Sequence, residues 1–159
     1  MTVSPTRAPV VIIGVGSAMR RDDGLGPAAL ARLGPLEEAR SGEVELVSLD
    51  GEPTRLIDAW SGRRRAVVID AVCADSPPGS IHRLVLGRHR LPPGTRGASS
   101  HAAGLAEAVE LGAALDRLPD ELVVLGMEPG DVSSGEELSP SVAEAMGRLV
   151  SMAMAEACR

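Results

Sequence analysis

The stretch "PVVIIGVGSAMRRDDGLG", residues 9–26, decides the fold, because an apolar run leads directly into a glycine-rich turn that carries two adjacent carboxylates. The run at residues 9–14 contains no polar side chain and ends in glycine, which is typical of a strand buried on both faces. Residues 23–33 then have helical spacing and place Pro27 in the first turn, where proline is tolerated. The stretch therefore predicts a strand, a tight turn and a helix.

The rest of the chain continues this alternation. Further strands are expected at residues 44–49, 66–72, 80–86 and 122–127, and further helices at residues 54–60, 101–115 and 139–157. Strands that alternate with helices favour βαβ units around a parallel sheet. A Pro/Gly-rich loop follows at residues 87–100, and a loop of that length in a small domain is usually functional or mobile. We expect one domain over residues 1–159, with residues 1–8 as a loose leader.

Composition limits the chemistry. The 159 residues include no Lys, Asn, Gln, Phe or Tyr, and all 16 basic residues are Arg. Without Lys there is no Schiff base and no phosphate-loop lysine, so catalysis must use Asp, Glu, His, Ser, Thr, Cys, Arg or the backbone. The net charge of -6 argues against a nucleic-acid partner, and the short run at residues 63–65 is expected to be a solvated loop.

Two cysteines, Cys73 and Cys158, provide neither a disulfide framework nor a metal pair. No signal peptide or transmembrane stretch is visible, so we expect a cytoplasmic protein with no membrane partner. Cys73 follows an apolar strand end and is expected to be a structural or incidental thiol, since apolar surroundings do not activate a thiol. His82 and His89 are expected to be solvated.

The turn after the first strand is a poor site for a nucleotide. A dinucleotide fingerprint needs a third glycine, but Met19 stands at that position, and Asp22 and Asp23 would repel a phosphate. The positive end of the helix dipole instead keeps a nearby carboxylate ionised, as a cation ligand requires. The alternative is that one of the two aspartates only caps the helix.

Two more ligand-type residues are expected at the same edge of the sheet. Asp70 ends the apolar strand "AVVIDAV", and in a right-handed doubly wound sheet that strand neighbours the first strand on the side away from the second. His101 opens a helix in "SSHAAG". Asp23, Asp70 and His101 would supply two oxygens and one nitrogen, a set suited to a divalent transition metal with open positions for a substrate.

The ordered motifs "GVGSAMRRDDGLGP", "DGEPT", "VVIDAV", "SSHAAGL" and "LGMEP" resemble those of the hydrogenase maturation endopeptidases. This resemblance extends from Val10 to about Met146. It implies an α/β fold, a three-layer sandwich in which helices flank a twisted, mostly parallel five-stranded sheet.

The resemblance also implies a function. Enzymes of this family remove the C-terminal tail of the large-subunit precursor of [NiFe] hydrogenase, and nickel already inserted in that substrate is the recognition element. Asp23, Asp70 and His101 match the family's acidic residue, Asp and His, as nickel ligands and catalytic residues of an aspartic-type, nickel-dependent endopeptidase. The metal is expected to arrive with the substrate, and the chain is expected to be a monomer. Which carboxylate accepts the proton during hydrolysis stays open.

One departure from the family pattern leaves an alternative function open. "DGEPT", residues 50–54, stands where the usual pattern is Asp-Gly-Gly-Thr, a segment tied to substrate recognition. Pro53 and Glu52 are expected to make this loop stiffer and more acidic. The chain could therefore be a non-catalytic metal- or partner-binding module on the same fold. Glu128 is either a support for the site's hydrogen-bond donors or an ordinary strand-end residue.

Overall fold

The computed structural model describes residues 7–36, 41–86 and 100–159, without the side chains of residues 100–103. Five strands form one sheet in the order β2-β1-β3-β5-β4. Their bounds are β1 Val10–Val15, β2 Val44–Leu49, β3 Arg65–Ala71, β4 Ile81–Leu86 and β5 Glu121–Met127. The first three pairings are parallel and β4 runs antiparallel to β5, so the expected mostly parallel, five-stranded sheet is confirmed.

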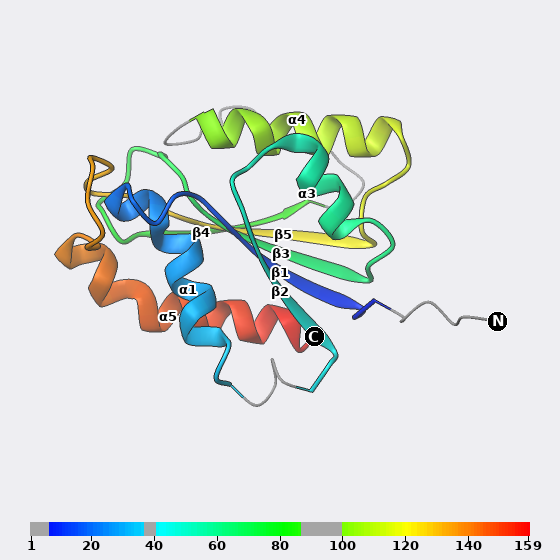
Figure 1. Cartoon of the computed structure of the whole chain (residues 1–159), viewed down its shortest axis with the longest axis horizontal. Coiled ribbons are helices and arrows are strands. Elements are labelled where there is room, and N and C mark those ends of the chain that lie inside the picture. The colour runs from blue at the N-terminus through cyan, green and yellow to red at the C-terminus, as the bar shows by residue number, and fades with distance from the viewer. Residues whose placement is uncertain (1–6, 37–40, 87–99) are drawn as a thin grey trace.

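Helices cover both faces of the sheet. Their bounds are α1 Leu25–Leu33, α3 Pro53–Trp60, α4 Ser100–Ala114 and α5 Pro140–Ala157, and a short 3-10 helix, η1, spans Arg21–Gly24. Figure 1 shows α1 and α5 on one face and α3 and α4 on the other, which is the expected three-layer sandwich. No helix in the described part of the chain is long and apolar enough to cross a membrane.

Successive strand residues point to opposite faces, so the sheet contributes to two aliphatic cores. Ile12 and Val67 belong to the core under α1 and α5. Ile13 and Val68 belong to the core under α3 and α4. All seven residues of β3 are buried, as expected for the central strand of a sheet covered on both faces.

The start of the first helix differs from the prediction. The sequence predicts a helix over residues 23–33, whereas the structure has η1 first and begins α1 at Leu25. Gly24 is the N-cap residue of α1 and Arg20 that of η1, and neither makes a side-chain capping bond. Neither Asp22 nor Asp23 is therefore the N-cap residue of η1 or α1, and their carboxylates accept from Ser139 and Ser17 respectively.

The prediction of a solvated loop at residues 63–65 is wrong. Arg63 and Arg65 are 2% and 6% exposed, and only Arg64 is exposed. The guanidinium of Arg63 donates to two backbone carbonyl groups and pairs with Glu45. Arg65 begins β3 and pairs with Glu156. In a chain without Lys these arginines satisfy buried acceptors through their five donors, so the run is structural.

Three sequence predictions concern residues or side chains outside the part of the chain that the structure describes. These are the leader at residues 1–6, the Pro/Gly-rich loop through residue 99 with His89, and the side chain of His101.

Candidate functional site

The candidate site lies at the carboxyl ends of the parallel strands, where the order of the strands changes direction. β1 has β2 on one side and β3 on the other, as the sequence predicts. In Figure 1, α1 follows β1 on one face, and α3 follows β2 on the opposite face. Loops that leave neighbouring strands toward opposite faces open a crevice at this edge, and α/β proteins place their sites there.

The loop after β1 brings Asp23 back against the end of the strand. Gly16 has a φ of +136°, and a Cβ atom at this position would lie 1.8 Å from the carbonyl oxygen of Asp23. Only glycine allows this close approach. The backbone N–H of Ser17 donates to Asp23 Oδ2 at 3.0 Å, and the side chain of Asp23 is fully buried. The glycine-rich turn therefore holds a carboxylate.

Asp70 is the last but one residue of β3 and is fully buried. Its Oδ1 accepts a hydrogen bond of 2.8 Å from the backbone N–H of Ala71, while its Oδ2 is buried and has no hydrogen-bond partner among the described residues. Burial is the main cause that raises the pKa of Asp70 to about 8, and the negative charge of Asp23 raises it further. The effect of Asp23 indicates that the two carboxyl groups are neighbours.

Asp22, the first residue of the acidic doublet, has a different environment. Its Oδ2 accepts from the backbone N–H groups of Gly130 and Asp131 at 2.7 and 2.8 Å, and from the hydroxyl of Ser139 at 2.6 Å. Its Oδ1 accepts from the backbone N–H of Ser139 at 2.8 Å. Burial alone would raise the pKa of Asp22, but these hydrogen bonds outweigh it and hold the pKa below its ordinary value. Asp22 is therefore a saturated structural carboxylate.

His101 belongs by its backbone to the first turn of α4. One turn further along the helix, a Cβ atom at Gly104 would lie 2.3 Å from the carbonyl oxygen of Gly51, which follows β2. Glycine lets the two backbones touch, and this contact places the beginning of α4 at the same edge of the sheet as Asp23 and Asp70. The backbone of His101 is thus on the expected side of the molecule.

The "DGEPT" segment forms the start of α3. Glu52 is the N-cap residue, and its carboxylate accepts from the backbone N–H groups of Thr54 and Arg55, each at 3.1 Å. Asp50 pairs with Arg55 at 3.0 Å. The hydrogen bonds from Thr54 are the main cause that lowers the pKa of Glu52. The added acid therefore caps a helix, and Pro53 occupies the first helical position, which suits proline.

Three other residues singled out from the sequence are Cys73, Glu128 and His82. Cys73 is exposed and free, and partial burial together with the charges of Glu128 and Asp75 raises the pKa of its thiol, which disfavours a nucleophilic thiolate. Glu128 accepts from the backbone N–H of Ala74 at 2.7 Å. The prediction that His82 is solvated is wrong, because it is half-buried and its buried Nε2 has no hydrogen-bond partner among the residues that the structure describes.

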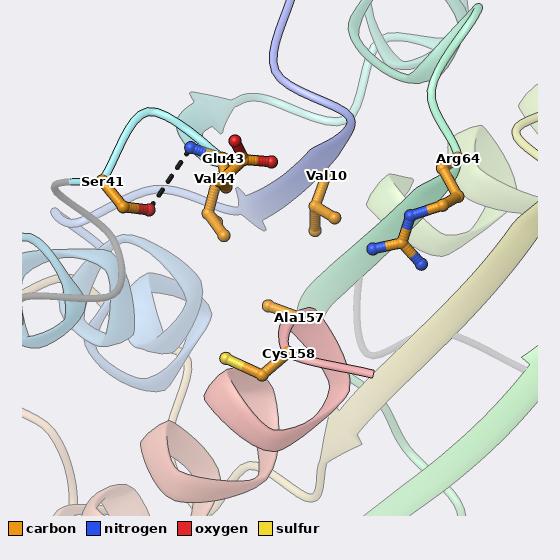
Figure 2. Close-up of a pocket in the computed structure, with 7 residues that line it drawn as sticks. All are labelled: Val10, Ser41, Glu43, Val44, Arg64, Ala157 and Cys158. Atoms are coloured by element: carbon orange, nitrogen blue, oxygen red, sulfur yellow. Dashed lines mark hydrogen bonds between the residues drawn. The ribbon is translucent and has the colours of Figure 1, made fainter.

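The structure also has a hollow of about 470 Å³ at the opposite edge of the sheet. Figure 2 shows it between Val10, Val44, Arg64 and Cys158. Val10 and Val44 begin β1 and β2, and Cys158 follows the end of α5, so these residues lie at the amino ends of the strands. This hollow is therefore separate from the paired carboxylates.

The described side chains include no group of three His, Cys, Asp or Glu residues that could hold a metal ion. Asp23 and Asp70 supply two buried carboxyl groups. The third ligand that the sequence predicts, His101, has its side chain outside the described part. A buried carboxyl oxygen without a partner is costly, and a cation between two carboxylates removes both this cost and their mutual repulsion. The chemistry of the two carboxyl groups therefore suits a divalent cation.

Fold and site together define an α/β protein with paired acidic groups at its topological switch point. The chain belongs to the hydrogenase maturation protease family, whose model HycI matches residues 34–156.

Individual relatives agree with this assignment. The hydrogenase expression/formation protein HupD of Thiocapsa roseopersicina is 27% identical over 146 residues, which are 91% of this chain and 66% of the relative, slightly less than two thirds of its length. The [NiFe] hydrogenase maturation protease HybD from Thermococcus kodakarensis has a similar structure, with a TM-score of 0.75, 27% identity, and 93% and 98% of the two chains covered. The hydrogenase maturating endopeptidase HybD from E. coli has a TM-score of 0.72 at 19% identity over 92% and 90% of the chains, which shows the fold alone.

Proposed function

We propose that this chain is an endopeptidase that removes the C-terminal extension of a nickel-loaded [NiFe] hydrogenase large-subunit precursor. Nickel in the substrate is the recognition element, and Asp23, Asp70 and His101 are its ligands. The enzyme acts in the cytoplasm as a monomer, and the metal comes with the substrate. An enzyme of this kind senses whether nickel has been inserted into its substrate and cleaves only the nickel-loaded form.

One observation carries this proposal. In a member of the hydrogenase maturation protease family, Asp70 Oδ2 is buried without a partner in the described part of the chain, and the charge of a second buried carboxyl group, that of Asp23, acts on it. Such an oxygen is normally satisfied within a protein. A metal carried by the substrate would supply the missing partner, so recognition and ligation become one event.

The chain's own residues have defined tasks in this scheme. Asp23 and Asp70 bind the metal through oxygen, and His101 binds it through an imidazole nitrogen. When bound, nickel supplies Lewis-acid chemistry that polarises a carbonyl group or orients water. One of the two carboxylates accepts a proton from the attacking water and passes it to the leaving amine as the peptide bond breaks. The products are the trimmed subunit and a free C-terminal peptide.

A second candidate is a module that binds the same precursor without cleaving it. The capped "DGEPT" segment favours it, because Glu52 and Pro53 fix a loop that is more flexible in the usual family pattern. Binding without catalysis requires only that the metal ligands remain.

The decisive experiment measures the intact mass of the large-subunit precursor after incubation with this protein, with and without nickel. The protein is compared with Asp23→Ala, Asp70→Ala and His101→Ala, each checked for folding by circular dichroism. We expect loss of a C-terminal peptide only with nickel and only with all three side chains intact. A fully active His101→Ala enzyme would refute the ligand set, and co-elution with the loaded precursor at unchanged mass would favour the binding module.

A further inference from the structure

The segment between β5 and α5, residues 128–139, is here called the β5–α5 loop. It is attached to the acidic doublet by one side chain: Asp22 accepts four hydrogen bonds from Gly130, Asp131 and Ser139. Three of these bonds come from backbone N–H groups, so the carboxylate fixes the course of the loop and not merely one side chain. Asp22 directly precedes Asp23, and whatever holds Asp22 also holds the turn that presents Asp23.

Backbone hydrogen bonds continue this attachment along the turn. The N–H of Arg21 donates to the carbonyl oxygen of Gly135 at 2.9 Å, and the N–H of Gly135 donates to that of Met19 at 2.9 Å. The N–H of Asp22 donates to the carbonyl oxygen of Asp131, also at 2.9 Å. Arg20 and Gly135 form an isolated parallel bridge. The β5–α5 loop thus runs beside the turn from Met19 onward.

The same loop is attached to the segment that follows Asp70. Glu128, its first residue, is 7% exposed, and its Oε2 accepts the backbone N–H of Ala74 at 2.7 Å. The backbone N–H of Glu128 donates to the carbonyl oxygen of Ser80, and its carbonyl accepts the N–H of Gly79, each at 2.8 Å. The loop after β3 is therefore held near both of its ends by this one residue.

From these contacts we infer that the β5–α5 loop is the positioning element of the processing site. It acts through Asp22 on Asp23 and through Glu128 on the segment after Asp70, and so sets the spacing of the two carboxyl groups. This inference rests on the proposed function for its catalytic consequence only. Supports of this kind commonly change activity or metal affinity by about 10-fold to 100-fold when removed.

The chain offers a matched pair of variants at residue 128. Glu128→Gln keeps an acceptor oxygen for the N–H of Ala74, whereas Glu128→Ala removes the acceptor from this part-buried hydrogen bond. We expect Glu128→Ala to lower kcat for tail removal by about tenfold with little change in KM, and Glu128→Gln to restore most of it. A role limited to stability would give folded variants with the kcat of the wild type.

At residue 22 the amide variant is expected to lose function, whereas at residue 128 the amide variant is expected to keep it. Asp22 accepts with both oxygens, so Asp22→Asn directs an amide N–H₂ group at a backbone donor and loses function even though it conserves shape. Ser139→Ala removes only the hydroxyl donor and provides a milder variant should Asp22→Asn fail to fold.

Amide hydrogen exchange gives a readout that needs no substrate. The N–H of Ser17 donates to Asp23 and the N–H of Ala71 donates to Asp70, so these two amides report where the carboxyl groups lie. The amide of Ile12, in the buried strand β1, reports global opening. We expect Glu128→Ala to speed exchange at Ala71 and Ser139→Ala to speed exchange at Ser17. In each case the exchange rate relative to that of Ile12 should rise by about tenfold or more, because the amide opens locally and not with the whole protein.

Two results would overturn the positioning role: folded variants with the wild-type kcat, or exchange at Ser17 and Ala71 that changes only in proportion to Ile12. A wild-type protein that cleaves no loaded precursor would instead refute the proposed function. In that case the exchange measurement still supports or overturns the positioning role by itself.

Discussion

Replacing Asp70 by Asn keeps the shape of the side chain and removes its ionisation, so this variant isolates the effect of one buried carboxyl group. Burial first, and then the charge of Asp23, raise the pKa of Asp70 from 3.8 to about 8. The unfolded chain loses this proton near the ordinary pKa of an aspartate. Between these two values the folded protein holds one more proton than the unfolded protein. Its free energy of unfolding therefore decreases as the pH rises.

The size of the effect follows from the two pKa values. Each pH unit inside the window lowers the stability of the wild type by about 1.4 kcal/mol relative to a protein without this group. The accumulated loss is about 4 kcal/mol at neutral pH and roughly 6 kcal/mol once the pH exceeds the pKa of the folded state. The stabilising effect of the protonated form is fully present below the ordinary pKa of aspartate and is lost as the pH rises through about 8.

Urea unfolding of the wild type and Asp70→Asn at a series of pH values from about 5 to about 9 tests this reasoning. The difference between their free energies of unfolding should grow in favour of Asp70→Asn up to about pH 8 and then become constant. Titration of the groups that do not interact with Asp70 cancels in the difference. Asp120→Asn, on the surface, controls for the substitution itself. A difference between wild type and Asp70→Asn that does not vary with pH would refute the burial argument.

Two further predictions concern the same edge of the sheet. Asp23→Asn removes the like charge that acts on Asp70, so in the same unfolding series the loss of stability should level off at a lower pH than in the wild type. If the loss levels off at the same pH as in the wild type, the two carboxyl groups do not interact. Gly104→Ala should lower the melting temperature because its Cβ would lie 2.3 Å from the Gly51 carbonyl oxygen, whereas Gly147→Ala, which meets nothing within 4 Å in α5, should raise stability by about 0.5–1 kcal/mol. Equal gains in thermal unfolding would show that the helix α4 does not depend on the contact at Gly104.

The strands and their order could be predicted because their signal is local. An uninterrupted aliphatic run such as residues 66–69 buries both faces, and the right-handed crossover rule then places β3 beside β1. From these two facts alone, Asp23 and Asp70 come to the same edge. Their proximity in the structure follows from topology, which the sequence pattern contains.

The different surroundings of Asp22 and Asp23 could not be predicted from the sequence. Asp22 and Asp23 are adjacent and chemically identical, and the partners that separate them lie more than a hundred residues further along the chain at Gly130, Asp131 and Ser139. The burial of Arg63 was missed for a related reason. Two of its three acceptors are the backbone carbonyl groups of Ala8 and Ala59, and backbone groups leave no trace in a composition pattern.

The acidic doublet gives a physical reason why Asp70, which has an oxygen without a hydrogen-bond partner in the described part of the chain, lies near Asp22, whose two oxygens accept four hydrogen bonds. An unpartnered carboxyl oxygen such as Asp70 Oδ2 favours any local rearrangement that would bring it a donor. Such a rearrangement requires the turn at Asp23 or the segment after β3 to move. Asp22 opposes the first movement with four hydrogen bonds, and Glu128 opposes the second through Ala74. The hydrogen bonds of Asp22 and Glu128 therefore hold Asp70 Oδ2 in surroundings where no group in the described part of the chain donates to it.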